Sequence, residues 1–135
     1  MSIRIVTEHN GRYRQCVDIE GFEDLFVDVD TAYGGDGTAP DPHDYFDLSL
    51  GACKAITAQM YARRKEWSLD GVSVTVKRDE REEAKGVYRL EVNMTFHGIK
   101  DPAQRERLEQ ISHKCPIHRL MTTSTVEITT RSDLG

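Results

Sequence analysis

The sequence has no long apolar run and no excess of positive charge. No stretch reaches the ~18 apolar residues that a membrane helix needs, so we do not expect a membrane protein. The formal net charge is −5, which argues against a nucleic-acid partner, because phosphate binding uses clustered basic side chains. The N-terminal residues become charged by Glu8 and lack a signal-peptide cleavage site, so we expect a cytoplasmic protein.

Cysteine is scarce, with three residues, Cys16, Cys53 and Cys115. An odd count disfavours a fixed disulfide framework, and cytoplasmic thiols are more often reduced, catalytic or inert. With 135 residues the chain is long enough to bury a core without disulfides. Internal repeats, low-complexity tracts and linkers are also lacking, so we expect a single domain over residues 1–135.

The first part of the chain predicts an antiparallel meander of three strands. The expected strands are Ser2–Glu8, Arg12–Glu20 and Asp24–Asp30. In the second and third strands apolar and polar residues alternate, as they do in half-buried strands. The pairs Asn10-Gly11 and Glu20-Gly21 mark the turns between the strands.

The segment from Asp41 to Lys65 predicts a long buried helix. Asp41 can cap its start, and Pro42 suits the first helical position. Its middle is apolar or small nearly all round, at Leu48, Leu50, Gly51, Ala52, Cys53, Ala55, Ile56, Ala58 and Met60. Such a helix is buried on most sides, which suggests packing between a sheet and a second subunit. Gly51 would let another backbone come close.

The rest of the chain predicts an α+β fold with a mostly antiparallel sheet and helices against one face. The remaining expected elements are strands over 72–76 and 88–96, a helix over Ala103–Lys114, a short helix from Pro116 and a last strand over Thr125–Arg131. Pro116 disfavours a helical conformation at Cys115, so a helix that begins at Pro116 would leave Cys115 as its N-cap. The order is β-β-β-α-β-β-α-α-β.

Cys115 is a candidate reactive thiol. At a helix N-terminus it would meet unpaired N–H groups and the positive end of the helix dipole, and both should lower its pKa. Lys114 and Arg119 would act in the same direction. The alternative is a small, inert residue that fills a helix corner.

Cys53 lies well inside the predicted helix, where the helix dipole does not activate a thiol. A nucleophile at this position needs a cation from elsewhere in the fold. Lys54 is adjacent but points about 100° away around the helix. Arg12 or Arg14, on a neighbouring strand, are therefore the better candidates. The alternative is an inert core cysteine.

Histidines near both cysteines add further candidates. His113, Cys115 and His118 offer metal-ligand types within six residues, but they lack the paired spacing of zinc sites, and we expect no metal and no cofactor. The two histidines are expected to be solvated. His43 and Asp44, in the first turn of the long helix, either cap it or form a polar anchor near a reactive thiol.

Two cysteine motifs carry a family resemblance. The first is Pro42-His43-Asp44-Tyr45-Phe46-Asp47-Leu48-Ser49-Leu50-Gly51-Ala52-Cys53, continued by Tyr61-Ala62-Arg63-Arg64-Lys65, and the second is Lys114-Cys115-Pro116-Ile117-His118. With the order of elements, they resemble the OsmC/Ohr family of osmotically inducible and organic-hydroperoxide-resistance proteins over nearly the whole chain.

The resemblance implies an OsmC-like fold, an intertwined homodimer and a thiol-dependent peroxidase. Cys53 would be the peroxidatic residue and Cys115 the resolving one, helped by an arginine from the N-terminal strands at Arg12. His43 stands where the hydroperoxide-resistance branch has a glutamate, and Lys54 stands where a threonine or apolar residue is usual. These departures indicate the broader OsmC-like branch.

The predicted function is reduction of organic hydroperoxides through a Cys53 sulfenic acid and a Cys53–Cys115 disulfide, which an external dithiol then reduces. The predicted catalytic set also includes Arg12, His43 and Asp44. An apolar pocket around Cys53 would favour organic hydroperoxides over hydrogen peroxide. The alternatives are a redox sensor that oxidises without turnover and a small-molecule-binding dimer with silent thiols.

Overall fold

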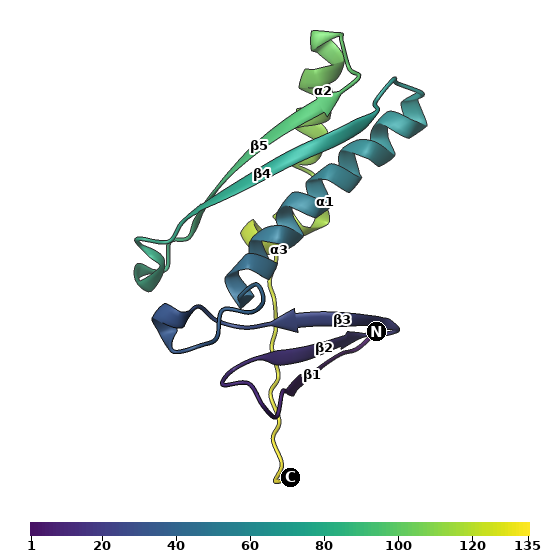
Figure 1. The fold of residues 1–135 in the computed structure, drawn as a ribbon. Coiled ribbons are helices and arrows are strands. Elements are labelled where there is room, and N and C mark those ends of the chain that lie inside the picture. The colour runs from purple at the N-terminus through teal and green to yellow at the C-terminus, as the bar shows by residue number, and fades with distance from the viewer. The chain divides into compact units, whose positions relative to one another are not determined.

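The computed structural model describes residues 1–135 and has the element order β1, β2, β3, α1, β4, β5, α2, α3 (Figure 1). By its internal contacts the chain divides into two compact units, a first unit over Met1–Leu48 and a second unit over Ser49–Gly135. The order agrees with the predicted α+β fold up to α3. No helix is both long and apolar enough to cross a membrane. The single domain expected over residues 1–135 stays a prediction.

The first unit contains the predicted meander. Its strands are β1 (Ile3–Thr7), β2 (Gln15–Ile19) and β3 (Phe22–Val27), paired antiparallel in that order. Ile5 pairs with Val17, and Val17 pairs with Leu25, so the three side chains share one face of the sheet. The strands β1 and β2 are shorter than predicted, because residues 8–14 form a wider turn that the Glu8 N–H closes on the Arg14 carbonyl at 2.9 Å. The strand β3 begins and ends earlier in the chain than the predicted Asp24–Asp30.

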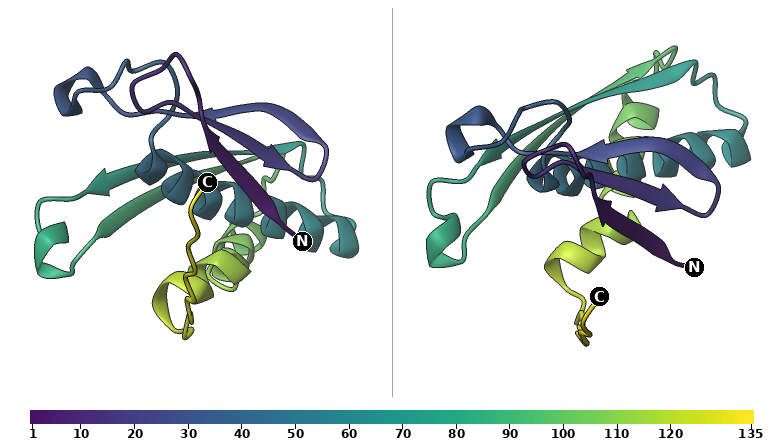
Figure 2. Two further views of the ribbon diagram at one scale, coloured as in Figure 1. Left: turned by 90° about the horizontal axis from the view of Figure 1, so that it is seen from below. Right: turned by 60° about the horizontal axis from the view of Figure 1, so that its bottom comes forward.

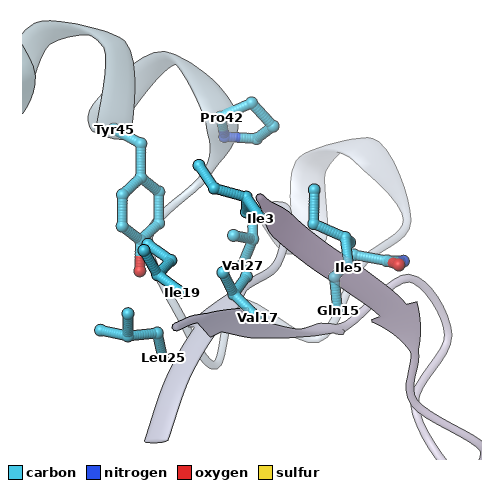
Figure 3. Close-up of a pocket in the computed structure, with 9 residues that line it drawn as sticks. All are labelled: Ile3, Ile5, Gln15, Val17, Ile19, Leu25, Val27, Pro42 and Tyr45. Atoms are coloured by element: carbon cyan, nitrogen blue, oxygen red, sulfur yellow. The ribbon is translucent and has the colours of Figure 1, made fainter. Parts of the chain in front are cut away.

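The shared face of this sheet is apolar and concave. It borders a cavity of about 400 Å³ (Figure 3). The cavity is lined by Ile3, Ile5, Gln15, Val17, Ile19, Leu25, Val27, Pro42 and Tyr45. The Tyr45 hydroxyl donates a hydrogen bond to the Phe26 carbonyl at 2.6 Å and so ties the start of the long helix to β3.

The long helix α1 runs from Pro42 to Lys65, with the predicted bounds. Its start is capped reciprocally: the Asp44 N–H donates to Asp41 Oδ1 at 2.8 Å, and the Asp41 N–H donates to Asp44 Oδ2 at 2.9 Å. These bonds satisfy donors that a helix end leaves unpaired. Most of α1 belongs to the second unit.

The second unit pairs β4 (Gly71–Asp79) with β5 (Arg89–His97) as a long antiparallel ribbon beside α1 (Figure 2). Its helices α2 and α3 cover Pro102–Ser112 and Pro116–Thr122. Ala58, Ala62 and Leu108 form the fully buried centre of the core. Partly buried side chains surround them, at Tyr61, Trp67, Leu69, Val72, Met94, Phe96 and Ile99. Because Ala58 and Ala62 on α1 are small, they leave room for the Leu108 side chain of α2.

The predicted last strand, Thr125–Arg131, is wrong. Residues 124–135 have no regular secondary structure, and Ile128 is 83% exposed. The alternating pattern suits a strand, but a strand also needs a neighbour to accept its ladder hydrogen bonds, and the chain provides none for this segment. The helix predicted to end at Lys114 ends at Ser112.

Gly51 marks the close approach of α1 to β4. A Cβ at this position would lie 2.9 Å from Val76 Cγ2 and 3.5 Å from Val74 Cγ1. We expect Gly51→Val to lower the free energy of unfolding by about 1–3 kcal/mol, because the added methyl groups overpack this contact. Urea denaturation measures the change. Gly71→Val is the matched control, because nothing lies within 4 Å of a Cβ there. Equal stability of the two variants would contradict the close-contact argument.

Candidate functional site

The junction between α2 and α3 positions Cys115 as the sequence predicts. α2 ends at Ser112, α3 begins at Pro116, and Cys115 has the extended N-cap conformation with φ −64° and ψ 142°. The His118 N–H donates a hydrogen bond to Cys115 Sγ at 3.4 Å. Proline favours the first helical position and is unfavourable further in, which sets this boundary.

The two thiols of the second unit lie together. Cys53 is half-buried on α1, and Cys115 is fully buried, with no exposed surface. A hydrogen bond joins their side chains, and both are free thiols. Two residues separated by 61 positions of intervening chain are thus brought within interaction distance by the fold of one unit.

The pKa of Cys115 is raised, against the sequence-based expectation. Burial is the main cause, because the thiolate loses its water. The His118 N–H bond does lower the pKa, as a helix N-terminus should, and so does the charge of Lys54. Burial and the neighbouring Cys53 outweigh both effects, so Cys115 favours its protonated form.

Lys54 corrects a second prediction. Its side chain is 4% exposed, and Nζ donates to the Ser112 carbonyl at 2.9 Å and lies 3.0 Å from His118 Nδ1. Both Cys53 and Cys115 act electrostatically on this amine. The expectation that Lys54 points away considered only where its side chain leaves the helix. A lysine stem is long and flexible enough to bring the amine back toward a neighbouring residue.

The pKa of Lys54 is lowered, mainly because burial disfavours the ammonium, although the two thiol groups favour it. The pKa of His118 is also lowered, by burial and then by the charges of Lys54 and His113. A neutral His118 can accept a hydrogen bond at Nδ1. Because His118 is half-buried and lies 3.0 Å from the Lys54 amine, the prediction of a solvated side chain is wrong, whereas His113 is exposed as expected.

A small cavity of about 110 Å³ adjoins Lys54. Its walls come from α1, β5, α2 and the residue after α2, at Lys54, Val92, Met94, Phe96, Glu109, Ser112 and His113. Lys54 therefore both lines this space and acts electrostatically on the two thiols. A metal ion at Nδ1 of His118 would have to displace Lys54 from that atom.

The other predicted site residues lie in the first unit. The Arg12 side chain is exposed, and its N–H donates to Asp36 Oδ2 at 3.3 Å. His43 is half-buried, and Asp44 caps α1. The thiol pair belongs to the second unit, and the roles of Arg12, His43 and Asp44 stay predictions.

The Arg14 side chain makes three contacts within the first unit. Nε lies 2.9 Å from Glu8 Oε2, Nη1 donates to Thr38 Oγ1 at 2.7 Å, and the guanidinium stacks 4.1 Å from the Phe26 ring centroid. Cys16 also lies in this unit and donates to a Glu8 oxygen at 3.9 Å. These contacts give Arg14 a bridging role between the sheet and the loop at Thr38.

Sequence reasoning missed Lys54 and His118 as members of the site. A usable signal was present: Lys54 interrupts an apolar helix, and a lysine enclosed by protein requires partners for its charge. The identity of those partners depends on the α2–α3 junction, which is remote in sequence.

The fold and the site together define an α+β protein with paired free thiols beside a buried lysine. The chain belongs to the OsmC-like protein family, whose model matches residues 35–131. No curated protein sequence matches it.

Solved structures with the same fold share little sequence with this chain. A Psychrobacter arcticus 273-4 protein, named for osmotic stress induction and detoxification response, has a TM-score of 0.76 and 17% identity, covering 91% of this chain and 89% of that one. An organic hydroperoxide resistance protein OsmC of Legionella pneumophila has a TM-score of 0.67 and 17% identity, with 91% and 90% covered. OhrB of Bacillus subtilis, an organic hydroperoxide resistance protein, has a TM-score of 0.57 and 17% identity, with 91% and 92% covered.

The raised pKa of Cys115 is measurable. We expect this thiol to titrate above the ordinary value of 9.0, followed by NMR of cysteine labelled at 13Cβ. Lys54→Met should raise its pKa further, because the ammonium favours the thiolate. The control is Lys114→Met, which removes an exposed charge next to Cys115 in the chain. A Cys115 pKa below 9.0 would show that the helix N-terminus outweighs burial.

Proposed function

We propose that this protein is a thiol-dependent peroxidase that reduces organic hydroperoxides through a Cys53 sulfenic acid and a Cys53–Cys115 disulfide. The observation that carries the proposal is the contact between two free thiols, one half-buried and one buried, beside the amine of Lys54. A lone reactive cysteine needs no second thiol in contact, whereas a two-cysteine cycle does.

The cycle has three balanced steps. The Cys53 thiolate attacks a peroxide oxygen, the O–O bond breaks, and the alkoxide takes a proton to leave as an alcohol, so that Cys53 becomes a sulfenic acid. The Cys115 sulfur then displaces hydroxide from Cys53 and forms the disulfide, with release of water. An external dithiol reduces the disulfide by exchange and is itself oxidised. No cofactor takes part.

The roles of the first-unit residues are also proposals. Arg12 is proposed to stabilise the Cys53 thiolate, and His43 and Asp44 to bind the peroxide at the position where the hydroperoxide-resistance branch has its glutamate. The resemblance supports these assignments. Arg12 has an exposed guanidinium for such a contact, whereas Arg14 has three partners in its own unit.

Two observations support an organic hydroperoxide as the substrate class. The Legionella and Bacillus proteins of the same fold are named for organic hydroperoxide resistance. In this chain, Leu50 and Ile56 lie three residues before and after Cys53 on the same helix, so an alkyl group at the half-buried thiol would meet apolar side chains. Burial of an alkyl group contributes about 25 cal/mol per Å².

The cysteine variants test the cycle. Cys53→Ser should abolish turnover of cumene hydroperoxide with dithiothreitol, because the attacking sulfur is gone. Cys115→Ser should accumulate sulfenic acid at Cys53 and overoxidise to sulfinic acid after few turnovers, because nothing resolves it. Peroxide consumption and peptide mass mapping measure the two effects.

Cys16→Ser is the matched control and should keep wild-type turnover, because Cys16 belongs to the first unit and contacts Glu8. Full activity of Cys53→Ser would refute the proposed function. Consumption of only one peroxide per subunit, with excess dithiol present, would instead identify a redox sensor.

We also propose that the protein acts as a homodimer. The α1 residues Leu48, Ala52, Ile56 and Met60 follow a four-residue spacing that places them on one helix face, and all are exposed. The first unit has its own uncovered apolar face, around the cavity of about 400 Å³. A second copy of the chain would cover such surface, which isolated proteins rarely expose over a large area.

Light scattering should give a particle of twice the 15.4 kDa chain mass. Ile56→Glu should shift it to the monomer on dilution, because the variant places a charge in an apolar interface. Gln59→Glu is the control, since Gln59 is an exposed polar residue of the same helix and should leave the dimer intact. A wild-type protein that stays monomeric at high concentration would rule out the dimer.

A further inference from the structure

The geometry points to Lys54 as the acid–base group of the disulfide-forming step, where it carries a proton from the Cys115 thiol to the hydroxide that leaves Cys53. This inference rests on the proposed function and adds a residue to it. It starts from a difficulty in that cycle: a thiol resolves a sulfenic acid as the thiolate, but Cys115 is fully buried and favours its protonated form.

A base near Cys115 has to be a group of the second unit that reaches the buried thiol. The titratable groups near Lys54 are Cys53 on α1, Cys115 and His118 at α3, and, lining the same cavity, Glu109 on α2 and His113 just after it. The strand β5 contributes only Val92, Met94 and Phe96 to the adjacent cavity. The Lys54 amine lies 2.9 Å from the Ser112 carbonyl and 3.0 Å from His118 Nδ1, three residues before and after Cys115, and both thiols act electrostatically on it.

The hydrogen bonds of Lys54 leave one position on its nitrogen for this task. A neutral amine has two N–H groups and one lone pair, and an ammonium has a third N–H in place of the lone pair. The Ser112 carbonyl, at 2.9 Å, takes one N–H group, and His118 Nδ1, at 3.0 Å, takes a second in the tautomer that carries its proton on Nε2. The remaining position can hold or release a proton without breaking either bond.

Burial makes proton release feasible for this amine. An exposed lysine stays an ammonium at neutral pH, whereas the Lys54 side chain is 4% exposed and its pKa is lowered. The cavity of about 110 Å³ next to it has room for water, which could exchange protons with solvent after the step.

The proposed step balances without an added reactant. Cys115 Sγ loses its proton to the Lys54 amine and bonds to Cys53 Sγ, and the S–O bond of the sulfenic acid breaks. The new ammonium gives a proton to the departing hydroxide, which leaves as water. The Cys115 sulfur is oxidised and the Cys53 sulfur is reduced, so the peroxide remains the sole oxidant, and Lys54 returns to its starting state.

Single-turnover kinetics separate this step from the peroxide step. Reduced protein receives one equivalent of cumene hydroperoxide, and samples are quenched over time with dimedone for sulfenic acid and N-ethylmaleimide for thiols. Lys54→Arg keeps the charge but holds its proton at all working pH values. Lys54→Met removes the charge and keeps an apolar stem of similar length.

We expect both variants to form the Cys53 sulfenic acid and to form the disulfide about 100-fold more slowly than wild type, the usual size of a lost acid–base contribution. Lys114→Arg, a conservative change at an exposed lysine beside Cys115, should behave as wild type. Disulfide formation at the wild-type rate, with an unchanged pH profile, in both Lys54 variants would overturn the inference and leave the peroxidase cycle intact.

A second measurement uses no peroxide. NMR of lysine labelled at 13Cε should show Lys54 titrating below the ordinary value of 10.5, and lower still after diamide forms the disulfide, because the two thiol groups that favour the ammonium are then gone. Titration of Lys54 at or above 10.5 would refute its acid–base role whatever the turnover. A wild-type protein that forms no sulfenic acid would refute the proposed function, while the Lys54 titration still decides the lysine's protonation.

Discussion

A single buried amine organises the second unit around its thiols. Transfer of a charged group from water into protein is costly unless hydrogen bonds and opposite charge compensate for the loss of water. Lys54 meets this requirement with the Ser112 carbonyl at the end of α2, with His118 on α3 and with the electrostatic influence of both cysteines. The compensation therefore joins three helices. A replacement at any of these contacts would affect the environment of the Cys53–Cys115 pair as well as the stability of the unit.

Cys115 shows local structure and burial acting in opposite directions on one group. The N-cap position supplies the His118 N–H, which stabilises a thiolate, and the surrounding core removes water, which destabilises it. Burial dominates, so the resolving thiol of the proposed cycle stays protonated and out of contact with solvent. In the proposed cycle the half-buried Cys53 reacts with the peroxide. The buried Cys115 reacts afterwards with the sulfenic acid.

Much of the fold could be predicted from short-range patterns. The α1 bounds follow from the cap at Asp41 and the basic last turn, and alternation located β4 and β5. The last strand was predicted by the same alternation and is absent. A helix satisfies its backbone within itself, whereas a strand depends on a neighbour that the local sequence does not specify. This difference explains why the strand predicted over Thr125–Arg131 is absent, whereas the predicted helix α1 is present.

The sequence by itself determined the helix boundary at Pro116, and hence the N-cap position of Cys115, because proline restricts the backbone on both sides of itself. It also determined that Cys53 lies inside a helix too far from its start for the dipole to act. Only the tertiary structure decided which amine joins the thiols. A side-chain direction at the helix surface is a local quantity, but the final place of the Lys54 amine depends on Ser112 and His118, more than fifty residues away, and on the burial that their contact creates.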